Sequence, residues 1–218
     1  MLRNQKGISV YAILSVILFA ALIFVLALPY FYNLDKDKNV DDCTTNMKSI
    51  WVAATDFVRD NRSDFGGDLN VLRNTPKASD PKSTYLAELT YCPETHREKN
   101  GYIVFGKYEE EMINEEVKQN TGVIVICPNL ENFPKHFLGK AFYENMSPTN
   151  LQNYMIDDLD WIDQQTKSNG ARKFNAVMRY IEIWKTDRET FAKRKADSTV
   201  LKKMIFPEAF PSAPDMGM

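Results

Sequence analysis

Cys92 and Cys127 each stand directly before a proline, and each precedes one of the two histidines of the chain, His96 and His136. Two cysteines and two histidines can hold a zinc ion in tetrahedral coordination. Three residues separate the first cysteine from its histidine and eight separate the second pair, and neither spacing is that of a standard zinc finger. Histidines at the surface are the commoner explanation. The sequence therefore predicts no metal site and no cofactor, with zinc at these four residues as the weaker alternative.

The other residue types that carry chemistry form no recognisable active site. The chain has no G-x-S-x-G elbow, phosphate-binding loop, H-E-x-x-H pair or haem-attachment motif. Its 27 basic and 29 acidic residues nearly balance, whereas a nucleic-acid-binding protein needs a basic surface. We therefore expect a protein that is not an enzyme and does not bind nucleic acid.

Residues 8–28 contain no charged side chain. About 21 helical residues span roughly 30 Å, the thickness of the apolar part of a bilayer. Arg3 and Lys6 precede this stretch, and a positive flank stays in the cytoplasm. These features predict a single membrane-spanning helix with a cytoplasmic N-terminus and the remaining chain outside the cytoplasm. A cleaved signal peptide is the weaker alternative, because its apolar run would be shorter.

The rest of the chain predicts a mixed α/β domain. Apolar residues recur at helical steps over residues 47–58, so that Trp51 and Phe57 should face the domain. Residues 102–105 and 122–127 are rich in β-branched and aromatic side chains and predict two strands. The charged stretch 109–120 between them is either a short helix or a solvated loop. Two further helices are expected, one after Ser147 and one over residues 171–196.

The expected fold class is α+β, in which a long N-terminal membrane-spanning helix continues into a stalk and joins a small antiparallel sheet and two C-terminal helices. The expected organisation is a leader (residues 1–7), a transmembrane helix (8–32), the outer part of the same helix (33–62), a loop and small β-sheet region (63–146), a C-terminal helical region (147–206) and a disordered tail (207–218).

Several N-terminal features together resemble type IV pilins and type II secretion pseudopilins. Lys6-Gly7 stands directly before the apolar helix, and Pro29 is the twenty-second residue counted from Ile8. Residues 43–50 (CTTNMKSI) are similar to the helix that follows in that family. The resemblance covers about a quarter of the chain. It implies a pilin-like fold, cleavage by a prepilin peptidase after Gly7 and methylation of the new amine at Ile8. It also implies a bacterial inner-membrane location, with the domain periplasmic or extracellular in a filament.

One position departs from the family pattern. The fifth residue of the mature chain is commonly a glutamate that pairs with the N-terminal ammonium of a neighbouring subunit, and here it is Ala12. Some minor pseudopilins at filament tips also lack this acid. The resemblance therefore implies a minor or tip subunit, with Ala12 and Pro29 in the helix packing of the filament.

The resemblance also bears on Cys92 and Cys127, because some pilin-like proteins form a disulfide between cysteines at comparable Cys-Pro positions. A Cys92–Cys127 disulfide would close a loop of about 35 residues in an oxidising periplasm, where such a bond contributes roughly 2–4 kcal/mol. Cys43 would then be the unpaired cysteine, although it could instead form a disulfide with Cys92 or Cys127.

The function that this resemblance implies is that of a structural subunit in a type IV pilus, competence or type II secretion filament. Its partners would be other pilin-like subunits, the inner-membrane assembly machinery, the prepilin peptidase and membrane lipid. The alternative is an uncleaved, single-pass membrane-anchored periplasmic protein that binds a ligand or another protein.

Overall fold

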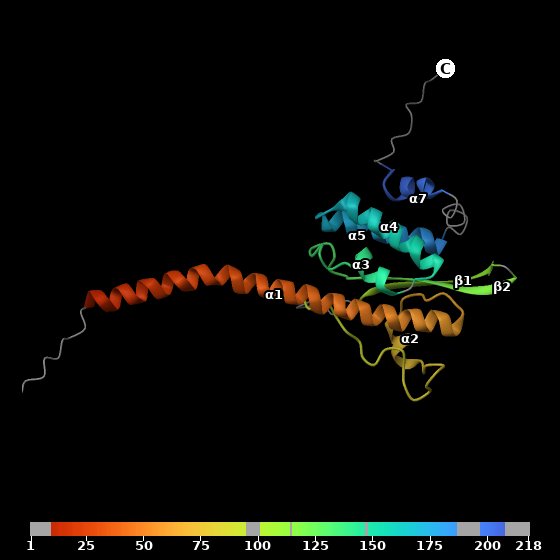
Figure 1. Cartoon of the computed structure of the whole chain (residues 1–218), viewed down its shortest axis with the longest axis horizontal. Coiled ribbons are helices and arrows are strands. Elements are labelled where there is room, and N and C mark those ends of the chain that lie inside the picture. The colour runs from red at the N-terminus through yellow and green to blue at the C-terminus, as the bar shows by residue number, and fades with distance from the viewer. Residues whose placement is uncertain (1–9, 95–100, 114, 147, 187–196, 208–218) are drawn as a thin grey trace, which may run out of the picture. The chain divides into compact units, whose positions relative to one another are not determined.

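The computed structural model describes residues 10–94, 101–113, 115–146, 148–186 and 197–207. The chain divides into two compact units, Met1–Asp41 and Asp42–Met218. Helix α1 (Val10–Asn61) runs through the boundary between them, and its N-terminal part is drawn in red in Figure 1.

The expected membrane-spanning helix is contradicted. Among the helices of the described ranges, none combines the length and the apolarity that crossing a membrane requires. Much of the length of α1 comes from residues 36–61, which are charged or amphipathic. The α+β class agrees with the helices and antiparallel hairpin of the described chain.

The second unit is built around a β-hairpin that lies between two groups of helices (Figure 1). The elements after α1 are α2 (Leu69–Asn74), β1 (Ile103–Ile113), β2 (Glu116–Ile126), α3 (Lys140–Tyr143), the 3-10 helix η1 (Glu144–Met146), α4 (Asn150–Thr166), α5 (Gly170–Thr186) and α7 (Ser198–Ile205).

Strand alternation gives the hairpin two buried faces. Val104 pairs with Val125, and both belong to a core that α1 closes with Met47, Ile50 and other residues. Phe105 pairs with Ile124, and both belong to a second core that α4 and α5 close. Successive side chains of a strand point to opposite faces, so each of the two strands supplies side chains to both cores. The two strands therefore hold the helical layers together.

Three sequence expectations are corrected by these elements. Residues 109–113 and 116–120 extend the two strands instead of forming a helix or loop. The short helix α2, with Asp68 accepting a hydrogen bond from the amide of Asn70, lies within residues 63–146, where only a loop and a small β-sheet were expected. Within the described residues, a further C-terminal helix, α7, follows the two expected ones. The end of the expected helix over residues 171–196 and nearly all of the expected tail lie outside the described residues.

The outward-facing backbone groups at both edges of the hairpin have hydrogen-bond partners. The Gly106–Val123 pair turns its backbone groups away from the hairpin. On the β1 side, the amide and carbonyl of Gly106 bond to the backbone of Phe65. The amide of Val123 donates to Oε1 of Gln152 at 2.7 Å, and its carbonyl accepts from Nε2 of Gln152 and Nε1 of Trp51. Buried backbone groups need such partners, so these two side chains fix α4 and α1 to the sheet.

We expect Gln152→Ala to lower the stability of the domain by about 1–3 kcal/mol, because it leaves the buried amide of Val123 without its acceptor. The measurement is the midpoint of urea-induced unfolding. Asn153→Ala, at the exposed neighbouring position on the same helix, is the matched control and should change little. Equal midpoints for the two variants would show that Gln152 does not hold this edge.

Candidate functional site

The residues singled out in the sequence fall in different parts of the chain. Lys6, Gly7 and Ile8 lie outside the described residues, as does His96, while Ala12 and Pro29 lie within helix α1. Cys92, Cys127 and His136 lie together in the second unit. Two candidate sites follow, the apolar start of α1 and a cluster of sulfur and nitrogen atoms.

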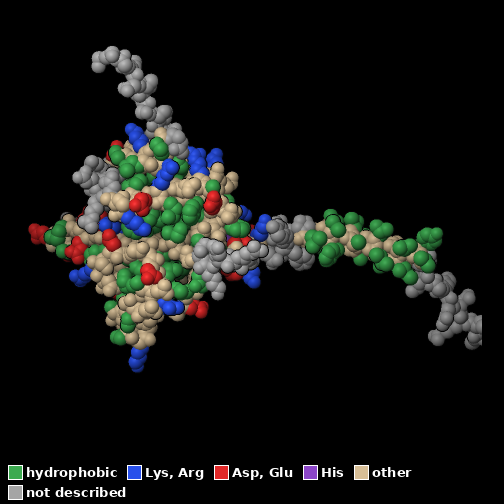
Figure 2. All heavy atoms as spheres, turned by 180° about the vertical axis from the view of Figure 1, so that it is seen from behind, with side chains coloured by type: hydrophobic (Ala, Val, Ile, Leu, Met, Phe, Trp, Pro, Cys, Tyr) green, Lys and Arg blue, Asp and Glu red, His purple; other side chains and the backbone are tan. Residues whose placement is uncertain are grey.

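The start of α1 exposes apolar side chains on every side. Four successive residues from Val16 to Phe19 are 67%, 59%, 73% and 64% exposed. Because successive helical residues point about 100° apart, these four cover the whole circumference. Figure 2 shows this part of the helix as a nearly continuous run of hydrophobic side chains. Ser15, Val16, Phe19, Ala20 and Ile23 line a shallow groove along it.

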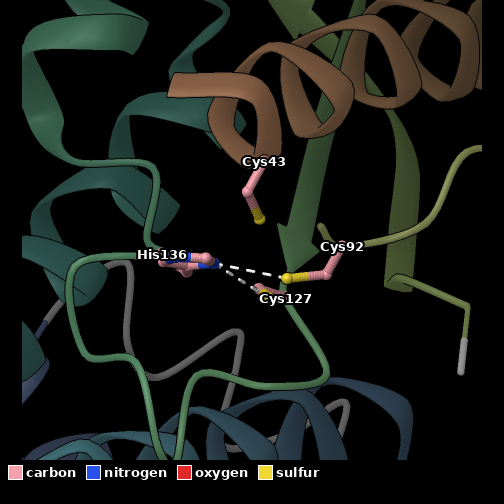
Figure 3. A group of neighbouring side chains, drawn as sticks. All are labelled: Cys43, Cys92, Cys127 and His136. Atoms are coloured by element: carbon pink, nitrogen blue, oxygen red, sulfur yellow. Dashed lines mark hydrogen bonds between the residues drawn. The ribbon is translucent and has the colours of Figure 1, made fainter. Parts of the chain in front are cut away.

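The cysteine–histidine cluster consists of Cys43, Cys92, Cys127 and His136. All four side chains are buried, and one ligand atom from each lies within 4.8 Å of the other three. Nδ1 of His136 lies 3.3 Å from Sγ of Cys92 and 3.8 Å from Sγ of Cys127. In Figure 3 the sulfur of Cys43 points from helix α1 toward the other three side chains.

Three separate segments position this cluster. Cys43 lies on α1, Cys92 on the irregular chain before β1, and Cys127 directly after β2. His136 follows in a loop whose course is set by backbone bonds. The amide of Leu130 donates to the carbonyl of Cys127, and that of His136 donates to the carbonyl of Phe133. The loop begins at Cys127 and turns back, so that His136 lies beside that cysteine.

Two of the three sulfurs accept hydrogen bonds from groups around the cluster. The backbone amide of Asn129 donates to Sγ of Cys127 at 3.4 Å, and the hydroxyl of Tyr102 donates to Sγ of Cys43 at 3.5 Å. The ring of Phe133 packs against His136 with 5.3 Å between centroids. Donors directed at sulfur favour a thiolate over a thiol, because they stabilise its negative charge.

The three thiols change one another's pKa values. The pKa of Cys92 is lowered, because Cys127 and then Cys43 hydrogen-bond to its sulfur. The pKa of Cys127 is raised by its contacts with Cys43 and Cys92 and by burial. Hydrogen bonding to Cys127 lowers the pKa of Cys43, but Cys92 and burial outweigh it and raise that pKa to about 12. Within the cluster the thiolate is therefore favoured at Cys92 over Cys43 and Cys127.

The structure changes the set of residues expected from the sequence. It keeps Cys92, Cys127 and His136 and adds Cys43, which sequence reasoning had left as an odd thiol. All three cysteines are free thiols, so the Cys92–Cys127 disulfide is not formed in this structure. One signal could have placed Cys43: it precedes the buried Met47 and Ile50 by four and seven residues, which puts it on the domain-facing side of its helix.

Comparisons with protein-family models, with characterised proteins and with solved structures found no match to this chain.

Proposed function

We propose that the chain is a structural, pilin-like subunit of a type IV pilus, competence or type II secretion filament. The observation that carries this proposal is the exposure of apolar side chains around the whole circumference of α1 before residue 29. A helix that is apolar all round is stable only when it is buried. One partner helix would cover one stripe, whereas a bundle of like helices covers every side.

The occupant of this surface is the corresponding helix of other pilin-like subunits. The shallow groove lined by Ser15 and Ala20 suits such packing, because small side chains let the ridge of a neighbouring helix approach closely. The sequence features at Lys6-Gly7 support the same assignment by resemblance. The role is mechanical, and the second unit provides the outer surface.

The subunit is minor or located at the filament tip. Where the family commonly has a glutamate, this chain has Ala12. Leaving a buried ammonium of a neighbour without its carboxylate costs several kcal/mol, so a filament of this chain alone would repeat that cost at each subunit. A tip subunit has no neighbour above it to neutralise.

We expect Ile17→Asp to remove the chain from assembled filaments, because it places a carboxylate on a surface that like helices must cover. The full chain is expressed in a cell with a type IV pilus system, and sheared filaments are assayed by quantitative mass spectrometry. The amount incorporated should fall at least about tenfold, since 1.4 kcal/mol already gives that factor. Whole-cell abundance should stay the same.

Val52→Asp is the matched control, since Val52 is also an exposed residue of α1 but lies in the second unit. It should incorporate as the wild type does, at trace level and without residues 1–7. Two results would contradict the proposal: a stable wild-type chain that is absent from sheared filaments, and one that is their dominant subunit.

A further inference from the structure

We propose that Cys43, Cys92, Cys127 and His136 bind one zinc ion, which serves a structural role. This inference concerns the second unit and does not depend on filament assembly. The four side chains come from three segments that are far apart in the sequence, yet their ligand atoms converge on one buried point (Figure 3). Three sulfurs and one imidazole nitrogen form one of the usual ligand sets of structural zinc.

The distances fit a tetrahedral ion. Zn–S bonds of about 2.3 Å at tetrahedral angles place sulfur atoms about 3.8 Å from each other and about 3.6 Å from the histidine nitrogen. Nδ1 of His136 lies 3.3 Å and 3.8 Å from two of the sulfurs, and all four ligand atoms lie within 4.8 Å of one another. Binding thus needs only small side-chain shifts.

The surroundings of the cluster match those of a metal site. Groups that hydrogen-bond to metal ligands orient them and stabilise their charge. Here the amide of Asn129 donates to Cys127, and the hydroxyl of Tyr102 donates to Cys43. Backbone hydrogen bonds hold the loop from Cys127 to His136, so that the distance between these two ligands is set before any ion binds.

Zinc explains the cluster better than a disulfide does. A disulfide would use two sulfurs and require them to approach to about 2.05 Å. It would leave the third cysteine and His136 buried beside it without a shared role. Zinc uses all four groups: the cysteines bind as thiolates, any thiol protons pass to solvent, and the histidine binds as the neutral imidazole.

The ion is structural because the protein would fill all four coordination positions. A catalytic zinc keeps one position open for water or substrate. The bound ion would join helix α1, the chain before β1 and the loop after β2, which no disulfide connects. Its role is to fix the start of the second unit to the hairpin.

The test is metal analysis of the full chain, purified without chelator or reductant. Inductively coupled plasma mass spectrometry should find one zinc per chain. Cys43→Ser and His136→Ala should each weaken zinc binding at least about tenfold, since even loss of a group that only supports a ligand costs that much. His96→Ala is the matched control: it removes the other histidine of the chain and should keep the zinc.

A second measurement uses only the wild-type protein and therefore does not depend on whether the variants fold. Wild-type protein reloaded with Co²⁺ should show sulfur-to-cobalt charge-transfer absorption and the strong visible bands of tetrahedral cobalt. The proposal is overturned if the wild type carries no zinc, if peptide mapping finds two of the three cysteines in a disulfide, or if His96→Ala loses the ion while Cys43→Ser keeps it. Stoichiometric iron or copper in place of zinc would equally overturn it.

Discussion

Gly170→Ala should destabilise the second unit and weaken zinc binding, although Gly170 is not a ligand. A Cβ at this position would lie 2.6 Å from the carbonyl oxygen of Leu130 and closer still to that of Glu131. Both atoms belong to backbone, so no side-chain rotation can relieve the contact. Since these residues lie in the loop from Cys127 to His136, the loop must move, and the spacing of two ligands changes with it.

The expected loss in free energy of unfolding is about 1–3 kcal/mol, the usual cost of overpacking a well-filled site. Urea unfolding measures this loss, and competition with a chromophoric zinc chelator measures the affinity. Gly139→Ala is the matched control, because a Cβ there would meet nothing within 4 Å. A destabilised Gly170→Ala protein with wild-type zinc affinity would show that this loop does not set the geometry of the site.

The parts of the fold that the sequence predicts well are those with a clear local pattern of apolar residues. Trp51 is buried as the helical period indicates, and the strands near residues 104 and 124 are buried runs of β-branched and aromatic side chains. The outer hairpin was missed because it carries no such pattern: residues 116–119 are all exposed, so no face of the strand there is apolar. Hydrogen bonding to β1 holds this segment as a strand, and the sequence of the segment by itself does not indicate that pairing.

The candidate metal site could be predicted only in part for a related reason. Cys127 and His136 are close in sequence, and their common loop is visible as a Cys-Pro corner followed by a histidine. Cys43 and Cys92 join them only because the long helix and the irregular chain before β1 pack on the same side of the hairpin. The tertiary fold brings these residues together, and the spacing of residues along the sequence does not show it.

Removal of zinc should lower the thermal midpoint of the second unit by roughly 5–10 °C. An ion that binds only the folded state at a hundred times its Kd adds about 2.7 kcal/mol, and each kcal/mol shifts the midpoint of a domain of this size by about 2–4 °C. The ligands also determine how the stabilisation by zinc changes with pH. Thiols lose protons when they bind zinc, so the contribution is present at neutral pH and is lost as the pH falls.

Calorimetry of the full chain with and without a strong chelator measures this effect, and Zn²⁺ but not Mg²⁺ should restore the midpoint. Cys92→Ser is the control: it lacks a ligand, so its midpoint should be low already and should not respond to chelator. The loss should exceed that of an ordinary surface contact, because one buried ion joins the three segments that meet around Cys43, Tyr102 and Cys92. A wild-type midpoint that stays constant while the chelator removes the metal would contradict the prediction, because an ion bound only by the folded second unit must stabilise it.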